Sequence, residues 1–384
     1  MDKKKQRIIV ALSGGVDSSV AAFLLKKSGH EVIGLYMRNW HDSTLTKDNE
    51  CPWIEDSNYA LEVANQIGIP FQVLDLSQEY KERIINYMIN SYKEGLTPNP
   101  DILCNKKIKF DVFLNYAMKL KADYIATGHY CIKEKKKQSY IIKQGKDKIK
   151  DQTYFLCQIN QLQLAKSLFP IGELSKKEVR DIAQQNNLVT ANKKDSQGLC
   201  FVGKIKLPIF LQNQLKPKKG KIIEIESYSK IYKNIKDDSI AFNYKAGDGK
   251  EIGIHNGAHF FTIGQRKGLE IGGKKEPLFV ISTNVKENIV FVGMGQNHPG
   301  LFRQSLKLEI KKIHWIREET RMKISEKREY KVRIRHRQEL QDAALELTKN
   351  YLFIRFKKPQ RAIAKGQFAT WYSKSELIGS GPIN

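Results

Sequence analysis

The chain has 384 residues, of which 41% are hydrophobic and 28% are charged, a globular balance that excludes wholesale disorder. Lys and Arg number 66 against 41 Asp and Glu, which gives a formal net charge of +25. Two explanations of this excess stay open: a polyanionic partner such as a nucleic acid, or the lysine-rich composition of an AT-rich genome.

Membrane and secretory signals are absent from the sequence. No apolar run approaches the roughly 18–20 residues needed to cross a bilayer, and the apolar run 8–12 is too short for a signal-peptide core. The five cysteines are too few and too scattered for a disulfide scaffold. We therefore expect a cytoplasmic protein with no membrane partner and with reduced thiols available for chemistry.

The first half of the chain alternates short apolar runs with helical patterns. The patterns predict strands over 8–12, 32–36, 71–76 and 124–127, and helices over 18–28, 57–67, 79–93 and 106–120. A capping box formed by Ser175 and Glu178 predicts a further helix up to about residue 186. Strands that alternate with helices pair in parallel, so we expect an α/β fold with a doubly wound parallel sheet.

After about residue 207 the pattern changes to short β-branched runs separated by Gly and Asn turns, typical of small barrels or sandwiches. These runs cover 222–225, 278–282, 289–292, 351–356 and 368–372. The Lys/Pro/Gly stretch 216–220 marks a junction. We predict three domains: an α/β domain over 1–207, a small central β-rich domain over 208–278, and a C-terminal barrel-like domain over 279–384.

The strongest local motif is ALSGGVDSS, residues 11–19, between a predicted strand and a predicted helix. Two glycines let the backbone approach a ligand, and the helix N-terminus favours an anion such as pyrophosphate. Asp17 offers an oxygen ligand to Mg²⁺. The motif is neither a Walker A loop nor GxGxxG. It resembles the loop of the ATP-pyrophosphatase family, whose members split ATP between its α and β phosphates; the alternative is an ordinary glycine-rich turn.

A second motif places Cys104 in a loop with two prolines, at the predicted start of a helix and beside three lysines. Positive charge and a helix N-terminus both favour the thiolate form. A lone cysteine is more often a small core residue, but this polar, basic setting favours a reactive thiol. Asp101, three residues earlier, is placed to act as an acid or base.

Cys200 lies between Gly198 and Gly203, after a polar run. Two interpretations stay open: a mobile loop that delivers sulfur, or a buried cysteine that opens a strand. Two cysteines in separate loops suit sulfur transfer, in which one carries a persulfide and the other forms a disulfide with it. The remaining cysteines are expected to be structural: Cys51, Cys131 and Cys157.

A basic stripe is predicted in YKVRIRHR, residues 330–337. The two-residue period of a strand puts Lys331, Arg333, Arg335 and Arg337 on one face, where they could follow a phosphate backbone. The alternative is an ordinary solvated strand face. The lysine runs 133–137 and 216–219 are predicted to be solvated loops.

Seven motifs together resemble, in order and over nearly the whole chain, those of the bacterial-type tRNA-specific 2-thiouridylase family. They are SGGVDS at 13–18, MRNW at 37–40, NPDILCN at 99–105, ATGHY at 126–130, KDQTYFL at 150–156, DSQGLCF at 195–201 and TIGQRKGL at 262–269. Members of this family adenylate the wobble uridine of tRNA at its 2-oxygen and replace that oxygen with sulfur.

The resemblance implies an ATP-pyrophosphatase catalytic domain over 1–207 and a tRNA-contacting domain at the C-terminus. It implies ATP and Mg²⁺ as cofactors, with Asp17 as the metal ligand. The implied ATP-binding residues are Ala11, Leu12, Ser13, Gly14, Gly15, Val16, Asp17, Ser18, Met37 and Gly128. The implied tRNA-binding residues are Asn99, Pro100, Asp101, His129, Lys150, Asp151, Gln152, Arg335, His336 and Gln367. His336 stands where many relatives carry Tyr, although histidine also stacks on bases.

The implied enzyme is a tRNA-uridine 2-sulfurtransferase supplied by a persulfide sulfur-relay protein. The catalytic residues would be Asp101, Cys104 as nucleophile and Cys200 as persulfide carrier. A mechanistic alternative is an iron–sulfur cluster held by Asp101, Cys104 and Cys200, although no Cys-x-x-Cys pair supports it. A base buried in a duplex cannot be reached, so an anticodon base turned out of its stack suits both the substrate and the chemistry.

Two other classes of protein share part of this pattern. A small-molecule amidating ligase has the same nucleotide loop, but it leaves the two cysteine motifs unexplained. A non-catalytic RNA-binding protein accounts for the charge but not for the nucleotide loop. Pyrophosphate release that depends on added tRNA would discriminate against both.

Overall fold

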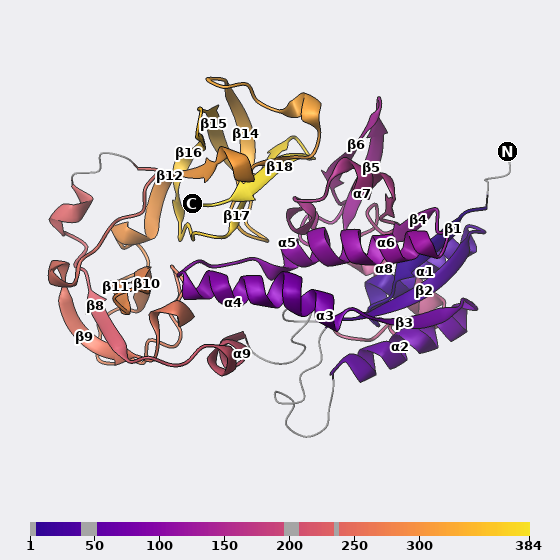
Figure 1. The fold of residues 1–384 in the computed structure, drawn as a ribbon, viewed down its shortest axis with the longest axis horizontal. Helices are drawn as coiled ribbons and strands as arrows, with labels where there is room; N and C mark the ends of the chain where they lie inside the picture. Colours follow the sequence, from indigo (N-terminus) through magenta and orange to yellow (C-terminus); the bar gives the residue numbers. More distant parts are fainter. Residues whose placement is uncertain (1–4, 40–51, 196–206, 234–237) are drawn as a thin grey trace.

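The structure is a computed structural model that describes residues 5–39, 52–195, 207–233 and 238–384. Figure 1 shows an N-terminal α/β unit, a middle unit built around a small sheet, and a C-terminal β unit that lies above the long helices. None of the helices described is long and apolar enough to span a membrane.

The N-terminal unit contains a five-stranded sheet of order β3-β2-β1-β4-β7, in which all pairings are parallel. Its strands are β1 Arg7–Ala11, β2 Glu31–Arg38, β3 Phe71–Asp75, β4 Tyr124–Ala126 and β7 Ser167–Leu168. Parallel neighbours need crossover connections, which the intervening helices supply. The α/β fold class predicted from the sequence is confirmed.

Helices cover both faces of this sheet because alternate residues of β1 point in opposite directions. Ile9 and Ala11 pack with the helices between 77 and 119, whereas Ile8 and Val10 pack with α1 and α2. The longer helices are α1 Val16–Lys27, α2 Pro52–Ile67, α4 Asn86–Lys93, α8 Lys176–Gln185 and α9 Leu207–Gln214. The shorter segments of this unit are α3 Ser77–Tyr80, η1 Lys81–Ile85, α5 Pro100–Cys104, η2 Asn105–Val112, α6 Phe113–Lys119, η3 Thr153–Leu156 and α7 Gln161–Ala165. The doubly wound arrangement is therefore confirmed.

The middle unit is a four-stranded sheet of order β10-β11-β8-β9. Its strands are β8 Gly220–Glu224, β9 Lys250–His255, β10 Leu278–Asn284 and β11 Ile289–Met294. Since β10 pairs with β11 and β11 pairs with β8, the unit extends to Met294. The sequence-based boundary at 278/279 is corrected accordingly, because a β-branched run does not reveal which sheet it joins.

The C-terminal unit is a nine-stranded antiparallel sheet that also takes in a hairpin from the N-terminal half. The strands from its own part of the chain are β12 Phe302–Glu309, β13 His314–Trp315, β14 Lys327–Arg333, β15 Gln341–Leu347, β16 Tyr351–Arg361, β17 Phe368–Ser373 and β18 Glu376–Pro382. Short helical turns of the two β units are η4 Lys230–Tyr232, η5 Ala246–Asp248, η6 Ala258–Phe260, η7 Pro299–Leu301, η8 Ile310–Lys312 and η9 Glu318–Thr320.

The added hairpin consists of β5 Cys131–Lys136 and β6 Ser139–Gln144, and Lys143 of β6 pairs with Glu376 of β18. The predicted solvated loop at 133–137 is therefore wrong for all but the turn. Lys137 makes that turn with a positive φ of 56°. The hairpin ties the N-terminal chain segment into the C-terminal sheet.

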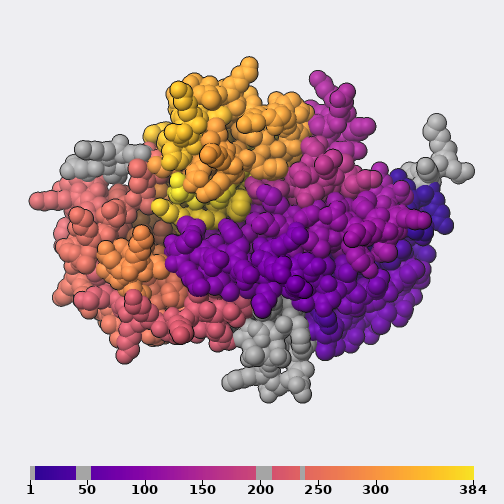
Figure 2. Space-filling model, viewed as in Figure 1, coloured from indigo at the N-terminus to yellow at the C-terminus, as the bar shows by residue number. Residues whose placement is uncertain are grey.

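The loop after α4 meets both β units. Thr97 donates its backbone N–H to the carbonyl of Lys365 at 2.7 Å, and its hydroxyl lies 3.3 Å from that of Thr262. In Figure 2 the purple segment that includes α4 lies against the yellow C-terminal strands and the orange part of the middle unit. The candidate site is built around this junction and around residues 13–18. These residues form the loop that is predicted to bind ATP, and it is called the nucleotide loop below.

Candidate active site

The nucleotide loop is held by its own serines. Ser18 receives the backbone N–H of Ser13 on its Oγ at 3.1 Å and donates that hydroxyl to the carbonyl of Gly15 at 3.1 Å. Ser19 donates to the same carbonyl at 2.9 Å. The chain enters α1 directly after this loop, so the helix N-terminus opens where an anion would sit.

Two glycines permit the close packing of this loop. A Cβ added to Gly14, whose φ is +71°, would lie 2.1 Å from the carbonyl oxygen of Asp56. A Cβ added to Gly128 would lie 2.7 Å from the backbone of both Asp17 and Ser18. Gly128 follows β4, beside β1 in the sheet, so the predicted residues 11–18 and Gly128 do come together.

Met37 lies near the end of β2, next to β1, and is half-buried against the apolar core. Of the other predicted ATP-binding residues, Ala11 is buried in the same core, Leu12 and Val16 are buried in two other apolar clusters, and Ser13 is exposed. Ligands in sheets of this kind bind at the carboxyl ends of the strands. All the predicted nucleotide residues lie at that edge.

Asp17 is the acidic residue of the loop, and two groups contact it. The Tyr130 hydroxyl donates to Asp17 Oδ1 at 2.7 Å, and Lys176 Nζ lies 2.7 Å from the same oxygen. Its side chain is 31% exposed, so one carboxylate oxygen remains within reach of solvent. A single accessible carboxylate fits Mg²⁺, which keeps waters and phosphate oxygens as its other ligands.

The Cys104 motif folds differently from the sequence prediction. Asn99 caps α5 by accepting the Ile102 backbone N–H at 3.1 Å, and Pro100 occupies the first helical position. Helical structure therefore begins at Pro100 rather than at 106, and Cys104 lies at the end of α5, where η2 continues the helix. The prediction that Cys104 opens a helix is wrong; its side chain is 1% exposed, whereas Asp101 is half-buried.

Gln367 of the C-terminal unit closes over the same motif. Asn99 donates to Gln367 Oε1 at 3.3 Å, and Gln367 donates to the carbonyls of Thr97 at 3.2 Å and Pro98 at 3.3 Å. Tyr154 lies 3.4 Å from Gln367 Oε1 and donates to the carbonyl of Phe368 at 3.0 Å. The structure thus brings together Asn99, Pro100 and Gln367, which the sequence separates widely.

His336 makes tilted aromatic contacts beside this junction. Its ring centroid lies 4.3 Å from that of Phe155 and 6.4 Å from that of Tyr154, and both of these residues belong to η3. Burial, together with the charges of Arg337 and Arg333, lowers the pKa of His336 to about 4. The ring is therefore neutral at physiological pH and presents a flat π surface rather than a cation.

The predicted cation stripe is wrong. β14 ends at Arg333, and Arg333 turns inward to pair with Asp151 at 2.8 Å, with side chains only 4% and 0% exposed. Lys331 pairs with Asp342 on the surface, while Arg335 and Arg337 are exposed in the turn that follows β14. An unfavourable buried charge is tolerated only when it is paired, and Asp151 supplies that partner.

The motif Lys150-Asp151-Gln152 faces inward as well. Gln152 accepts the backbone N–H of Tyr130 at 3.1 Å, and Lys150 lies 2.7 Å from Asp195. His129 is also buried, with Thr127 at 2.7 Å, and burial together with Lys109 holds its pKa well below the ordinary value. Among the predicted tRNA contacts, only Arg335 is fully exposed in this structure.

The cysteines divide into two groups. Cys200 and Cys51 lie outside the described residues, and so does the predicted pairing of Cys200 with Cys104. Burial raises the pKa of Cys157 to about 12 and raises that of Cys131 well above its usual range. Both thiols therefore stay protonated at neutral pH, as expected of structural cysteines.

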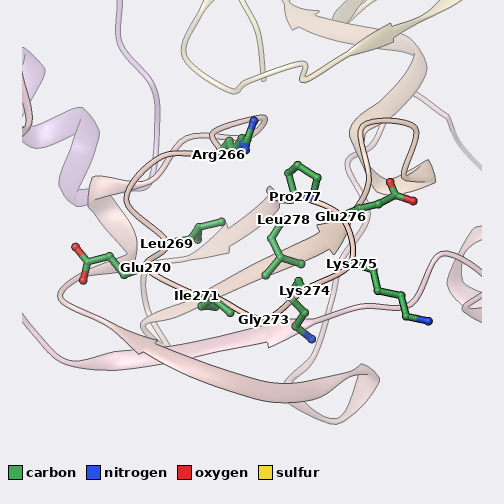
Figure 3. Close-up of a pocket in the computed structure, with 11 residues that line it drawn as sticks. Arg266, Leu269, Glu270, Ile271, Gly273, Lys274, Lys275, Glu276, Pro277 and Leu278 are labelled. Atoms are coloured by element: carbon green, nitrogen blue, oxygen red, sulfur yellow. The ribbon is translucent and has the colours of Figure 1, made fainter.

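Two features have no counterpart in the sequence predictions. Lys176, the first residue of α8, reaches the nucleotide loop; the capping box at Ser175 located the helix but not its contact. The second feature is a cavity of about 500 Å³ in the middle unit, bordered by Arg266 and the segment 269–278 (Figure 3). It adjoins the end of the TIGQRKGL motif.

Among the described residues, no group of three or more His, Cys, Asp or Glu side chains could hold a metal ion.

Comparison with known proteins covers all three units. The family "tRNA methyl transferase HUP domain" matches residues 6–204, "tRNA methyl transferase PRC-barrel domain" matches 209–294, and "Aminomethyltransferase beta-barrel domain" matches 305–383. The curated tRNA-specific 2-thiouridylase MnmA of Christiangramia forsetii is 54% identical and covers 99% of this chain and 100% of its own length. The protein of the same description from Flavobacterium johnsoniae is 53% identical over the same shares, and that of Geobacillus kaustophilus is 43% identical over 99% of this chain and 96% of its own. Identity at this level along the full length shows that the chain belongs to the tRNA-specific 2-thiouridylase family.

Proposed function

We propose that the protein is an ATP-dependent tRNA-uridine 2-sulfurtransferase that converts the wobble uridine of tRNA to 2-thiouridine. The observation that carries the proposal is the ion-paired chain from the nucleotide loop to the second cysteine motif. Lys176 contacts both Asp17 of the loop and Asp195, the first residue of the DSQGLCF motif. Nucleotide activation and sulfur delivery would therefore take place next to each other.

The first step would be adenylation of the base. The 2-oxygen of the uridine attacks the α-phosphorus of ATP in line, the bond between the α-phosphorus and the bridging oxygen breaks, and pyrophosphate leaves with the electron pair. The uridine then carries AMP, a far better leaving group than the original oxygen. The loop 13–18 would hold the phosphates through its N–H groups and the N-terminus of α1.

Asp17 is the residue that would hold Mg²⁺ on this loop, where the ion would neutralise phosphate charge. The carboxylate is oriented for this by the Tyr130 hydroxyl. The protein's own contribution is to fix the position of the phosphates and to keep water from the α-phosphorus.

The second step would be sulfur transfer. The terminal sulfur of a Cys200 persulfide, received from a sulfur-relay protein, attacks carbon 2 of the uracil and AMP leaves. The Cys104 thiolate then attacks the γ-sulfur of Cys200, the persulfide S–S bond breaks, and the sulfur stays on the base as the thiocarbonyl. A Cys104–Cys200 disulfide forms in the same event, so an external thiol must supply two electrons before the next turnover.

The base would be held by the junction around Asn99 and Gln367. A base that has left its helical stack loses stacking energy, which an aromatic side chain restores. The tilted contact of His336 with Phe155 supports such a role, because it holds the neutral, flat His336 ring in place. Arg335 is exposed beside it and is available to phosphates.

The proposal is tested by incubating the protein with tRNA, ATP and a sulfur source and analysing the wobble nucleoside by mass spectrometry. The expected product is 2-thiouridine, with one pyrophosphate released per thiolated tRNA. Pyrophosphate that forms equally without tRNA, or a wobble uridine that keeps its oxygen, would refute the proposal. An unmodified transcript whose wobble position is cytidine is the matched control.

A further inference from the structure

Five charged side chains from four segments of the chain meet at the nucleotide loop, and one of them is Asp17 of the loop itself. Lys176 Nζ lies 2.7 Å from Asp17 Oδ1 and 2.8 Å from Asp195 Oδ1. Arg180, one turn further along α8, lies 3.0 Å from Asp195 Oδ1, and Lys150 lies 2.7 Å from its Oδ2. Asp195 is thus surrounded by three cations, and one of them is shared with the nucleotide loop.

The electrostatics of this cluster favour an anion at the position of the Asp195 carboxylate. Burial opposes ionisation of Asp195, yet Lys150 and Lys176 outweigh it and lower the pKa of that carboxyl to about 2. Lys176 is only 13% exposed, and two of its three N–H donors are used on Asp17 and Asp195. Desolvating an ammonium is costly, and nearby negative charge offsets that cost. The mostly buried Lys176 between two carboxylates therefore marks a position where an anion is stabilised.

The backbone of α8 does not supply this anion site. The Lys176 backbone N–H donates to Asp147 at 3.0 Å, and the Glu178 N–H donates to Ser175 at 3.2 Å. Two N–H groups of the first turn are therefore already used within the protein. Whatever binds here would be held by the ammonium of Lys176 and the guanidinium of Arg180.

We propose that Lys176 and Arg180 form a second half of the phosphate site, which takes the β- and γ-phosphates of a nucleoside triphosphate opposite the loop 13–18. The inference rests on the proposed function, since it assumes that this loop binds ATP. Asp195 occupies the position of the phosphates in the nucleotide-free protein. When ATP binds, Lys176 exchanges the Asp195 carboxylate for phosphate oxygens while its contact with Asp17 keeps it at the loop.

This arrangement assigns Lys176 a catalytic role in the adenylation step. As the bond between the α-phosphorus and the bridging oxygen breaks, negative charge grows on the departing pyrophosphate. An ammonium already positioned there stabilises that charge without reorganising at the moment of reaction. AMP lacks the two outer phosphates, so it should be insensitive to the same side chain.

The test measures dissociation constants of ATP, AMP and pyrophosphate, each with Mg²⁺, by titration calorimetry on the full-length protein. Lys176→Gln is expected to weaken ATP and pyrophosphate binding by about tenfold to a hundredfold, the range of one charge-assisted contact, and to leave AMP within about twofold. Lys177→Gln is the matched control, because Lys177 lies next to Lys176 on α8 but is exposed. It should bind all three ligands like the wild type.

Asp195 provides the discriminating variants. Asp195→Asn removes the competing carboxylate and should tighten ATP binding, whereas a purely structural ion pair would give weaker or unchanged binding. The double variant Lys176→Gln/Asp195→Asn should still bind ATP more weakly than Asp195→Asn alone. If the double variant binds ATP as tightly as that single variant, the loss in Lys176→Gln comes from uncompensated carboxylates and the proposal is overturned.

Three further outcomes are equally decisive. Equal losses of ATP and AMP binding in Lys176→Gln would indicate a general structural defect and overturn the subsite, as would wild-type ATP affinity in that variant. Thermal unfolding midpoints of each variant show whether the fold is kept. A wild-type protein that binds no ATP would refute the proposed function itself, which separates the two failures.

Discussion

Asp151 and Arg333 form a 2.8 Å ion pair that is almost completely buried and joins residues 182 positions apart. Asp151 also accepts hydrogen bonds from Gln144 at 3.1 Å and from the Thr153 backbone N–H at 3.2 Å, while Arg333 lies over the ring of Tyr372 at 4.9 Å. The pair therefore fixes the C-terminal sheet to the α/β unit at the end of the strand that precedes His336.

Asp151→Asn is expected to destabilise the protein by about 3–5 kcal/mol, because the Arg333 charge would stay buried without its partner. The thermal unfolding midpoint measures this. The control is Asp342→Asn, which breaks the exposed pair with Lys331 in the same sheet and should leave the midpoint unchanged. An equal, small effect of both variants would show that the buried pair contributes no more to the stability of the protein than the exposed pair does.

His336 predicts a specific pH dependence of stability. Its folded pKa of about 4 lies below the ordinary value of 6.5, so between these two values the unfolded chain binds a proton that the folded protein does not. The contribution of His336 is complete above pH 6.5 and is lost as the pH falls towards 4. As the pH falls through this window, the unfolding midpoint of wild type should therefore fall relative to that of His336→Phe, and above the window the difference between the two midpoints should stay constant. Parallel curves throughout the acid range would contradict the low pKa.

The two-cysteine scheme predicts that Cys104→Ser and Cys200→Ser each abolish thiolation while ATP binding survives. The matched control is Cys157→Ala, because that thiol is buried, has a pKa of about 12 and has no part in the scheme. Nucleoside mass spectrometry measures thiolation, and peptide mapping after one turnover should recover the Cys104–Cys200 disulfide. Normal thiolation by either serine variant would contradict the two-cysteine scheme.

Gly128→Ala is expected to lower ATP affinity by about fivefold to a hundredfold, since overpacking against a rigid backbone costs about 1–3 kcal/mol and would displace the start of α1. The added methyl group would lie 2.7 Å from the backbone of Asp17 and Ser18. Gly247→Ala is the control, because a Cβ there would meet nothing within 4 Å. Wild-type ATP affinity in Gly128→Ala would mean that this contact does not shape the nucleotide site.

The persulfide and cluster mechanisms differ in metal content. Protein purified without oxygen is expected to be colourless, free of iron and active, because the persulfide scheme needs no metal beyond Mg²⁺. Iron determination and a visible spectrum on the same sample measure this. A coloured protein whose activity and iron are lost together on chelation would instead favour the cluster held by Asp101, Cys104 and Cys200.

Local patterns predicted the secondary structure around the loop 13–18 correctly. The strand β1, the glycine loop and the helix α1 depend on neighbours in sequence, and so does the capping box that opens α8 at Ser175. The contact of Lys176 with Asp17 could not be predicted in this way, since those residues are 159 positions apart. The capping box predicted the helix that carries Lys176, but nothing in the sequence predicted that Asp17 lies beside it.

Two of the failures have the same cause, which is a partner far away in the sequence, and the third has a local cause. The period of β14 predicted that Arg333 faces solvent, but Asp151 from another unit draws it inward. The charged residues of β5 were predicted to form a loop; β5 pairs with β6, and β6 in turn pairs with β18 at the far end of the chain. The helix before Cys104 starts early because Asn99 caps it and Pro100 suits its first position, a signal that was present in the sequence.

The β5–β6 hairpin has a practical consequence for dissecting the protein. A fragment that begins after Met294 would lack two strands of its own sheet and leave the edge beside Glu376 without its neighbour. Bare strand edges recruit other chains, so such a fragment should self-associate on expression. Splicing the 131–144 segment onto its N-terminus through a flexible linker would give engineers a version that stays monomeric.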